Sequence, residues 1–305
     1  MKFADLYSEA IIWTCYLENF PCPERYLNIY GLSINERLMF DQLGGLSPFD
    51  EFYVRCPGRE IARGISDLGL SKKSLILPWI YWPKGHLDTL QGKHVIAPSA
   101  EMFNRFDNKV ETKKLFERLG IPTPMWSFSN NVTQMVEKPI QDSAGGLGIS
   151  LTSLNPRDGY FLEEYASGYK SIGIQFFIYD EAEFICADEM LFNSDGTDAF
   201  TFHAQRNVEI DELPEKLIDN CLKLIEYISD KGYKGFIGID VLVREENYYF
   251  LEINPRGIAF LPAYFAASAR GWKRFKAYTE KKTPGDNALI LLDFGKLKKV
   301  VERLS

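Results

Sequence analysis

The sequence contains few histidines, no closely spaced cysteine pair and no long apolar run. Its three histidines, His86, His94 and His203, are not at metal-ligand spacing, which argues against a zinc enzyme. Five cysteines without a CxxC pair, and an N-terminus unlike a secretory signal, predict reduced thiols and a cytoplasmic location. No stretch approaches the roughly 18 apolar residues of a membrane-spanning helix, so no membrane segment is expected.

The charge balance is acidic, with 42 Asp and Glu residues against 35 Lys and Arg residues and a net charge of -7. Such a chain is not typical of a general nucleic-acid or anionic-membrane binder, although a local basic pocket can still hold a phosphate. Hydrophobic residues make up 46% of the 305 residues, which excludes a disordered chain. The length predicts about two domains, and we expect neither a nucleic-acid nor a membrane partner.

Residues 1–98 mix short apolar runs with Pro and Gly. Strands bounded by turn residues, with helices between them, predict a small Rossmann-like α/β lobe with a parallel sheet. The expected strands are 52–55, 74–78 and 94–97, and the expected helices are 33–42 and 61–68.

The rest of the chain predicts one long helix followed by mixed strands and helices. This helix, 99–119, begins with Ser99 as its N-cap and ends at Gly120. The alternating apolar pattern that follows favours antiparallel strands. The further expected elements are strands 136–140, 161–166, 171–179, 182–187 and 199–206, helix 213–231, a hairpin of 238–244 and 248–253 with its turn at 245–247, and a tail, 284–303, made of a strand and a basic helix.

Two carboxylates lie on opposite arms of the expected hairpin. Asn254 follows Glu252 by two residues, so both side chains point to one face of their strand, and Asp240 lies on the facing arm. Two carboxylates and an amide oxygen are ligands that suit Mg²⁺, and Arg256 would add a positive fork beside the ion. The alternative is a surface hairpin with ordinary alternating polar residues. The apolar remainder of the hairpin weighs against this alternative, because polar groups among apolar ones are costly unless paired or bound to an ion.

Lys138 lies in the expected strand 136–140, and a glycine-rich loop, 141–149, follows this strand. Glycines let the backbone approach an anion closely, and a strand lysine can neutralise the same phosphates. The loop is neither a Walker loop, which needs Lys-Ser/Thr after its last glycine, nor a Rossmann fingerprint, which leads into a helix. Taken alone, this loop is a weak indication of a phosphate site, because glycine-rich loops are more often plain turns.

The run Phe161-Leu162-Glu163-Glu164-Tyr165-Ala166 has two interpretations. The backbone of a strand-like linker can recognise an adenine through its carbonyl and N–H groups. Equally, the run can be an ordinary strand with acidic residues that face solvent.

In combination, these motifs resemble the ATP-grasp superfamily of carboxylate–amine or carboxylate–thiol ligases. The order is Asn108-Lys109, Lys138-Pro139, the glycine loop, Glu163-Glu164-Tyr165, and then Asp240 with Glu252-Ile253-Asn254-Pro255-Arg256. One part of this order is similar to the metal motif of that superfamily, as in biotin carboxylase: Asp240, Glu252 twelve residues later, and then Asn254 and Arg256 at alternate positions. The resemblance covers about 99–260.

The resemblance implies an α+β or α/β chain with the ATP-grasp fold: a pre-ATP-grasp lobe at 1–98 and an ATP-grasp domain at 99–305. Within that domain it implies a lid lobe at about 124–163 and a C-terminal antiparallel-sheet lobe at about 164–305. It also implies ATP and Mg²⁺ or Mn²⁺ as cofactors, and small-molecule carboxylate and amine substrates. The implied site residues are Lys109 and Lys138 for the phosphates, Ser143, Gly145, Gly146 and Gly148 for the phosphate lid, Glu163, Glu164, Tyr165 and Ala166 for the adenine hinge, Asp240, Glu252 and Asn254 for the metal, and Arg256 and Arg206 for catalysis.

One position departs from the pattern of these ligases. After the hinge, Gly168-Tyr169-Lys170 places Lys170 where many of them carry a Glu that holds the ribose hydroxyls. This departure supports one alternative, a non-catalytic ATP-binding protein that acts as a sensor or partner. Among short ligases, the layout most resembles the tyramine–glutamate ligases, on 74–78, 96–99 and 120–124. The sequence identifies neither the acid nor the amine. It also leaves the oligomeric state open, with a homodimer as one alternative.

Overall fold

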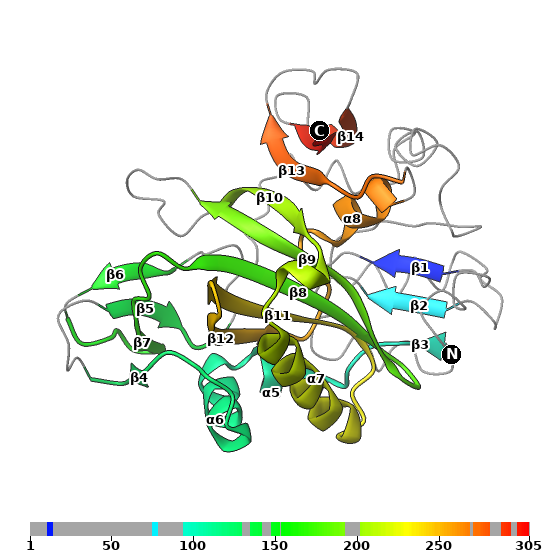
Figure 1. Cartoon of the computed structure of the whole chain (residues 1–305). Coiled ribbons are helices and arrows are strands. Elements are labelled where there is room, and N and C mark those ends of the chain that lie inside the picture. The colour runs from blue at the N-terminus through cyan, green and yellow to red at the C-terminus, as the bar shows by residue number, and fades with distance from the viewer. Residues whose placement is uncertain are drawn as a thin grey trace.

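Three β-sheets organise the part of the chain that the structure, a computed structural model, describes (Figure 1). The described residues are 11–14, 75–78, 94–129, 135–141, 148–152, 154–192, 202–268, 271–280, 288–293 and 298–304. In Figure 1 a four-stranded sheet lies to the left of an eight-stranded sheet, and a three-stranded sheet lies to its right.

The three-stranded sheet is parallel, with the order β1-β2-β3. Its strands are β1 (Ile11–Thr14), β2 (Leu75–Pro78) and β3 (His94–Val95). The parallel pairing confirms the sheet expected from the runs 74–78 and 94–97, whereas the sequence did not predict β1. The expected strand 52–55 and the expected helices 33–42 and 61–68 lie outside the described residues.

The four-stranded sheet, called the small sheet below, is antiparallel with the order β4-β7-β5-β6. Its strands are β4 (Trp126–Ser127), β5 (Met135–Pro139), β6 (Ser150–Thr152) and β7 (Tyr160–Glu164). The two strands expected at 136–140 and 161–166 are thus neighbours in this sheet. Because β5 pairs with β6, the glycine-rich segment connects two adjacent strands.

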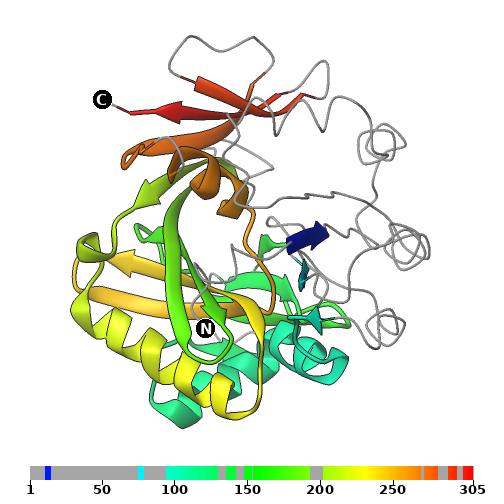
Figure 2. The ribbon, with the colours of Figure 1, turned by 90° about the vertical axis from the view of Figure 1, so that its right-hand side faces the viewer.

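The eight-stranded sheet, called the large sheet, is antiparallel with the order β12-β11-β8-β9-β10-β13-β15-β14. Figure 2 shows its two ends, the β11–β12 hairpin and the strands β13 to β15, far apart at the bottom and top of the view. The strands are β8 (Lys170–Ile178), β9 (Ala182–Phe192), β10 (Phe202–Val208), β11 (Gly235–Arg244), β12 (Asn247–Asn254), β13 (Phe275–Glu280), β14 (Ala288–Asp293) and β15 (Lys298–Arg303).

The long helix expected at 99–119 is two helices, α5 (Ala100–Asp107) and α6 (Lys109–Leu119). Ser99 caps the first and Gly120, in the left-handed region at φ 66°, ends the second, as expected. The break lies at Asn108, whose extended backbone interrupts the helix and whose side chain accepts a hydrogen bond from the Glu111 N–H at 3.1 Å. The prediction failed there because an asparagine that caps a new helix looks, in sequence, like any polar helix residue.

Helix α7 (Glu215–Asp230) covers one face of the large sheet, and its apolar stripe forms the main core with strands β8, β9, β11 and β12. The short 3₁₀ helix η2 (Ile210–Glu212) precedes it, and α8 (Leu261–Ser268) packs in a second core with β13 and β15. Among the described residues, no helix has both the length and the apolar character needed to cross a bilayer. The buried stripe of α7 is Leu217, Cys221, Leu224, Ile225 and Ile228.

The basic helix expected in the tail is wrong, because Lys298–Arg303 forms strand β15. This strand lies between β13 and β14 and pairs with both. The adjacent Val300 and Val301 are both fully buried, so the two faces of the strand are covered. Stiff β-branched side chains that are buried on both faces favour a strand over a helix.

Candidate functional site

The hairpin of β11 and β12 brings the two predicted metal carboxylates together. Asp240 pairs directly with Glu252 across the ladder, and Asn254 lies two residues further on the same strand face. The turn is one residue shorter than the expected 245–247, since Arg244 pairs with Asn247. The pairing register then shifts by one residue between Val241 and Asp240.

This bulge decides which face Glu252 occupies. A two-residue turn with regular pairing would set Asp240 opposite Leu251 and turn Glu252 to the other face of the sheet. The shift leaves Leu251 unpaired and restores the pairing of Asp240 with Glu252. The predicted placement of Asp240 opposite Glu252 is therefore confirmed, although the structure reaches it by a different turn, and their role as metal ligands stays a prediction.

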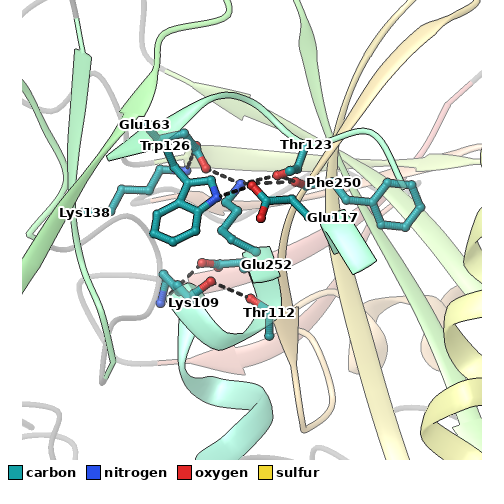
Figure 3. Close-up of polar contacts among 10 residues, drawn as sticks. Lys109, Thr112, Glu117, Thr123, Trp126, Lys138, Glu163, Phe250 and Glu252 are labelled. Atoms are coloured by element: carbon teal, nitrogen blue, oxygen red, sulfur yellow. Dashed lines mark hydrogen bonds and ion pairs between the residues drawn. The ribbon is translucent and has the colours of Figure 1, made fainter. Parts of the chain in front are cut away.

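The two carboxylates are only partly buried. Glu252 is 20% exposed and forms an ion pair with Lys109, with Nζ and Oε2 3.3 Å apart (Figure 3). Burial raises the pKa of Asp240 well above its usual range, and the Glu252 carboxylate raises it further. Burial acts to raise the pKa of Glu252 too, but Lys109 and Lys138 together lower it. A close carboxylate pair of this kind favours a bound cation, which relieves the repulsion between the two charges.

Asn254 links the carboxylates to Arg256. Its side chain hydrogen-bonds Asp240, and its Oδ1 accepts a hydrogen bond from Arg256 Nη2 at 3.0 Å. Within the described ranges, no group of three or more His, Cys, Asp or Glu side chains is arranged to hold a metal. The hairpin set of Asp240, Glu252 and Asn254 instead fits Mg²⁺, which commonly takes one or two carboxylates and completes its shell with phosphate oxygens and water.

Sequence reasoning missed a third acid in the same row of the sheet. Asp188 on β9 pairs with Gly173 on β8, which in turn pairs with Asp240. A Cβ on Gly173 would lie 2.8 Å from Asp188 Oδ1, so the buried carboxylate fills the space that a side chain at position 173 would need. Gln205 Nε2 donates to Asp188 Oδ2 at 2.8 Å. No sequence pattern marked Asp188, because the register of β9 against β8 is set by tertiary pairing.

A second cluster, called the lysine cluster, joins Lys138 on β5 and Glu163 on β7, both labelled in Figure 3, with Lys113 on α6. Both lysines form ion pairs with the Glu163 carboxylate. Lys113 Nζ also donates to Thr123 Oγ1 at 2.8 Å and to the Phe250 carbonyl at 3.2 Å. The cluster therefore connects the small sheet, helix α6 and the edge strand of the large sheet.

Burial dominates the electrostatics of this cluster. It lowers the pKa of Lys113 to about 8, although Glu163 acts in the opposite direction. Burial would raise the pKa of Glu163, but Lys113 and Lys138 lower it below its usual range. Sequence reasoning did not find Lys113; its spacing of four residues from Lys109 on one helix was the available indication.

The predicted adenine hinge lies at the end of β7. Glu163 does not face solvent there, since its side chain is buried in the lysine cluster and its backbone lies between the paired strands β4 and β5. The Glu164 N–H donates to the Met125 carbonyl at 2.8 Å. The strand ends at Glu164, and Tyr165 and Ala166 follow it.

Only one residue of the predicted phosphate lid falls in the described part of the chain. Gly148 has φ 77°, and a Cβ there would approach Tyr160 Oη at 3.4 Å. Such a conformation favours glycine at the base of the loop. Ser143, Gly145 and Gly146 lie outside the described residues.

Arg206 is not brought to the hairpin carboxylates. It follows Gln205 directly on β10, so the two side chains point to opposite faces, and only Gln205 reaches Asp188. The guanidinium of Arg206 instead binds Glu189, with Nη2 2.7 Å from Oε2. Lys170 lies near the same carboxylate, with its Nζ 3.7 Å from Oε1. Lys170, at the position where many of these ligases carry a ribose-binding Glu, thus lies beside Glu189.

Comparison with known proteins identifies the fold. Residues 106–259 match the ATP-grasp domain family. An uncharacterized protein of Methanocaldococcus jannaschii is 28% identical over 182 residues, which cover 53% of this chain and 44% of that protein. The matched segment thus spans less than half the length of this relative.

Solved structures with the same fold cover almost all of the chain. An ATP-grasp superfamily protein from Archaeoglobus fulgidus superposes with a TM-score of 0.65 at 14% identity, over 97% of this chain and 100% of that one. The biotin carboxylase domain dimer of the Hydrogenobacter thermophilus 2-oxoglutarate carboxylase, in complex with MgADP, ADP and bicarbonate, superposes with a TM-score of 0.61 at 13% identity, over 97% and 86%. The match over half of the sequence, joined to this likeness of fold, shows that the chain belongs to the ATP-grasp domain family.

Proposed function

We propose that this chain is an ATP-dependent, ADP-forming ligase that joins a carboxylate to an amine through an acyl phosphate. The observation that carries the proposal is the opposed pair of Asp240 and Glu252, which is partly exposed and adjacent to buried lysines. An acid pair and a group of cations side by side are what a magnesium–triphosphate complex requires of its site.

The residues take separate parts in this proposal. Lys109 and Lys138 would contact the phosphates of ATP, and the backbone of 163–166 would hold the adenine. Asp240, Glu252 and Asn254 would hold Mg²⁺ or Mn²⁺, which would supply positive charge to offset that of the phosphates. Gly148 would anchor the phosphate lid, together with Ser143, Gly145 and Gly146.

The chemistry needs no general base in its first step. A substrate carboxylate oxygen attacks the γ-phosphorus, the bond to the β,γ-bridging oxygen breaks, and ADP leaves with that electron pair. The amine nitrogen then attacks the acyl carbon, phosphate leaves, and the amine loses a proton to give the amide. Positioning and charge stabilisation account for the rate of such steps. Arg256, which donates a hydrogen bond to Asn254, would stabilise the tetrahedral intermediate. Arg206 has no part here, because it lies on the other face of the sheet.

The substrates are a small carboxylic acid and a small amine. The similarity of layout to tyramine–glutamate ligases makes L-glutamate and tyramine the first pair to test. The cysteine pattern supports a cytoplasmic location, and the dimeric biotin carboxylase domain supports a homodimer as the assembly to look for.

The test is ADP release by the purified chain with ATP, Mg²⁺ and a panel of acids and amines. We expect release that depends on both an acid and an amine and that stops when EDTA removes the metal. The Glu252→Gln variant should lose this activity, and Glu246→Gln, in the exposed hairpin turn, should keep it. AMP as the product would contradict the mechanism. Tight ATP binding without turnover for any pair would instead favour the non-catalytic sensor.

A further inference from the structure

Lys113 is a fully buried cation to which the proposed mechanism assigns no role. Its side chain has no exposed surface, and its ammonium group contacts Glu163, Thr123 Oγ1 and the Phe250 carbonyl. Burying a charged group is costly unless it is paired and hydrogen-bonded, so the fold retains this lysine at an energetic cost that its partners only offset.

The contacts of Lys113 tie three elements together. Lys113 belongs to α6, Glu163 to the small sheet and Phe250 to the edge strand β12. Phe250 immediately precedes Leu251, the bulged residue that returns Glu252 to the face of Asp240. Its carbonyl also accepts from Thr123 Oγ1 at 2.8 Å, so two donors converge beside the bulge.

The two lysines that share Glu163 differ in access. The side chain of Lys138 is 10% exposed, whereas that of Lys113 is 0% exposed. An anion from solvent can therefore reach only Lys138. Two lysines and one glutamate leave one surplus positive charge in the cluster, and Lys138 is the member of the cluster that solvent reaches.

We propose that Lys113 is a positioning residue of the nucleotide site, which takes up the charge of Glu163 and so leaves Lys138 available to bind a polyphosphate. The inference rests on the proposed function, in which Lys138 contacts the phosphates of ATP. Without Lys113, Glu163 would pair with Lys138 alone, and the cluster would carry no net charge. The affinity for the triphosphate would then fall, while contacts to the base and ribose would be unchanged.

The experiment compares the affinities of ATP and adenosine in four forms of the whole chain: wild type, Lys113→Met, Lys113→Met/Glu163→Gln and Lys114→Met. Lys114 is the matched control, since it is the next residue on α6, is 55% exposed and forms its ion pair with Glu111 at 2.8 Å. Displacement of a fluorescent nucleotide gives both dissociation constants. Their ratio does not depend on the folded fraction, because both ligands draw on the same folded population.

We expect Lys113→Met to reduce the preference for ATP over adenosine about tenfold, from the loss of roughly one charge at the phosphates. The double variant should recover the ratio to within about threefold of wild type, because the neutral amide that Glu163→Gln introduces no longer competes for Lys138. Lys114→Met should change it less than about twofold. An unchanged ratio in Lys113→Met, or no recovery in the double variant, overturns the inference and leaves the proposed function standing. Failure of the wild type to bind ATP overturns the proposed function itself.

Discussion

The two ionic clusters of the site have opposite compositions. In the lysine cluster, two cations, Lys113 and Lys138, share the single carboxylate of Glu163. In the hairpin cluster, two carboxylates, Asp240 and Glu252, face each other, and Lys109 forms an ion pair with Glu252. One cluster thus has a surplus of positive charge and the other a surplus of acids.

Helix α6 supplies a lysine to each cluster, at positions four residues apart on one face. The comparison teaches that the site carries both halves of the charge pattern that a metal–triphosphate complex needs: a place for the anion and, next to it, a place for the cation. Neither half is neutral by itself, so each depends on the ligand or on the other half.

The largest effect should come from the acid-rich half. Glu252→Gln is expected to lower acid- and amine-dependent ADP release by about 10²-fold or more, because groups that stabilise charge in the transition state contribute several kcal/mol. Glu246→Gln, exposed in the turn of the same hairpin, should stay near wild type. Equal losses in both variants would show that the hairpin acts through folding and not through its carboxylates.

Stability should depend on the other half. Lys113→Met is expected to lower the free energy of unfolding by about 2–3 kcal/mol, since it leaves the Phe250 carbonyl with one donor fewer and Glu163 with one cation fewer. Lys114→Met should change it by less than about 0.5 kcal/mol. Urea denaturation measures both, and similar values for the two neighbours would contradict the buried tie.

The pH dependence of stability should reveal the same lysine. Unfolded Lys113 keeps its proton to its ordinary pKa of 10.5, whereas burial lowers the pKa in the folded chain to about 8. Between these values the unfolded state binds more protons, so stability rises with pH. Relative to Lys113→Met, wild type should gain about 1 kcal/mol per pH unit from pH 8 to 10 in urea titrations. A flat difference would mean that Lys113 keeps its proton throughout this range.

The smallest effect is expected at Arg206, which belongs to neither cluster. Arg206→Gln should change the turnover rate by less than about threefold. The Arg206 guanidinium binds Glu189, and both residues lie on the sheet face that is turned away from Asp240 and Glu252. Arg256→Gln, which removes the donor to Asn254 Oδ1, should lower turnover by about tenfold or more. A large loss at Arg206 would show that its side chain leaves Glu189 when substrates bind.

The parts of the site that were predictable lie on single local motifs. Asp240, Glu252 and Asn254 follow from strand alternation within one hairpin, and the small-sheet strands follow from apolar runs around Lys138 and Glu163. Contacts between distant segments were not predictable in the same way. Lys113 meets Phe250 across 137 residues of sequence, and no pattern local to either residue announces that meeting.

What the residue order determined alone was the family pattern, the alternation of the hairpin, the Ser99 cap of α5 and the Gly120 end of α6, because these depend on neighbours within a few positions. The tertiary structure decided the rest. The bulge at Leu251 sets which face Glu252 takes, the row through Gly173 brings Asp188 beside Asp240, and pairing on both sides turns the tail into a strand. Register and burial arise only when separate segments pack together, so a one-residue shift that local preferences barely resist can move a whole set of side chains to the other face.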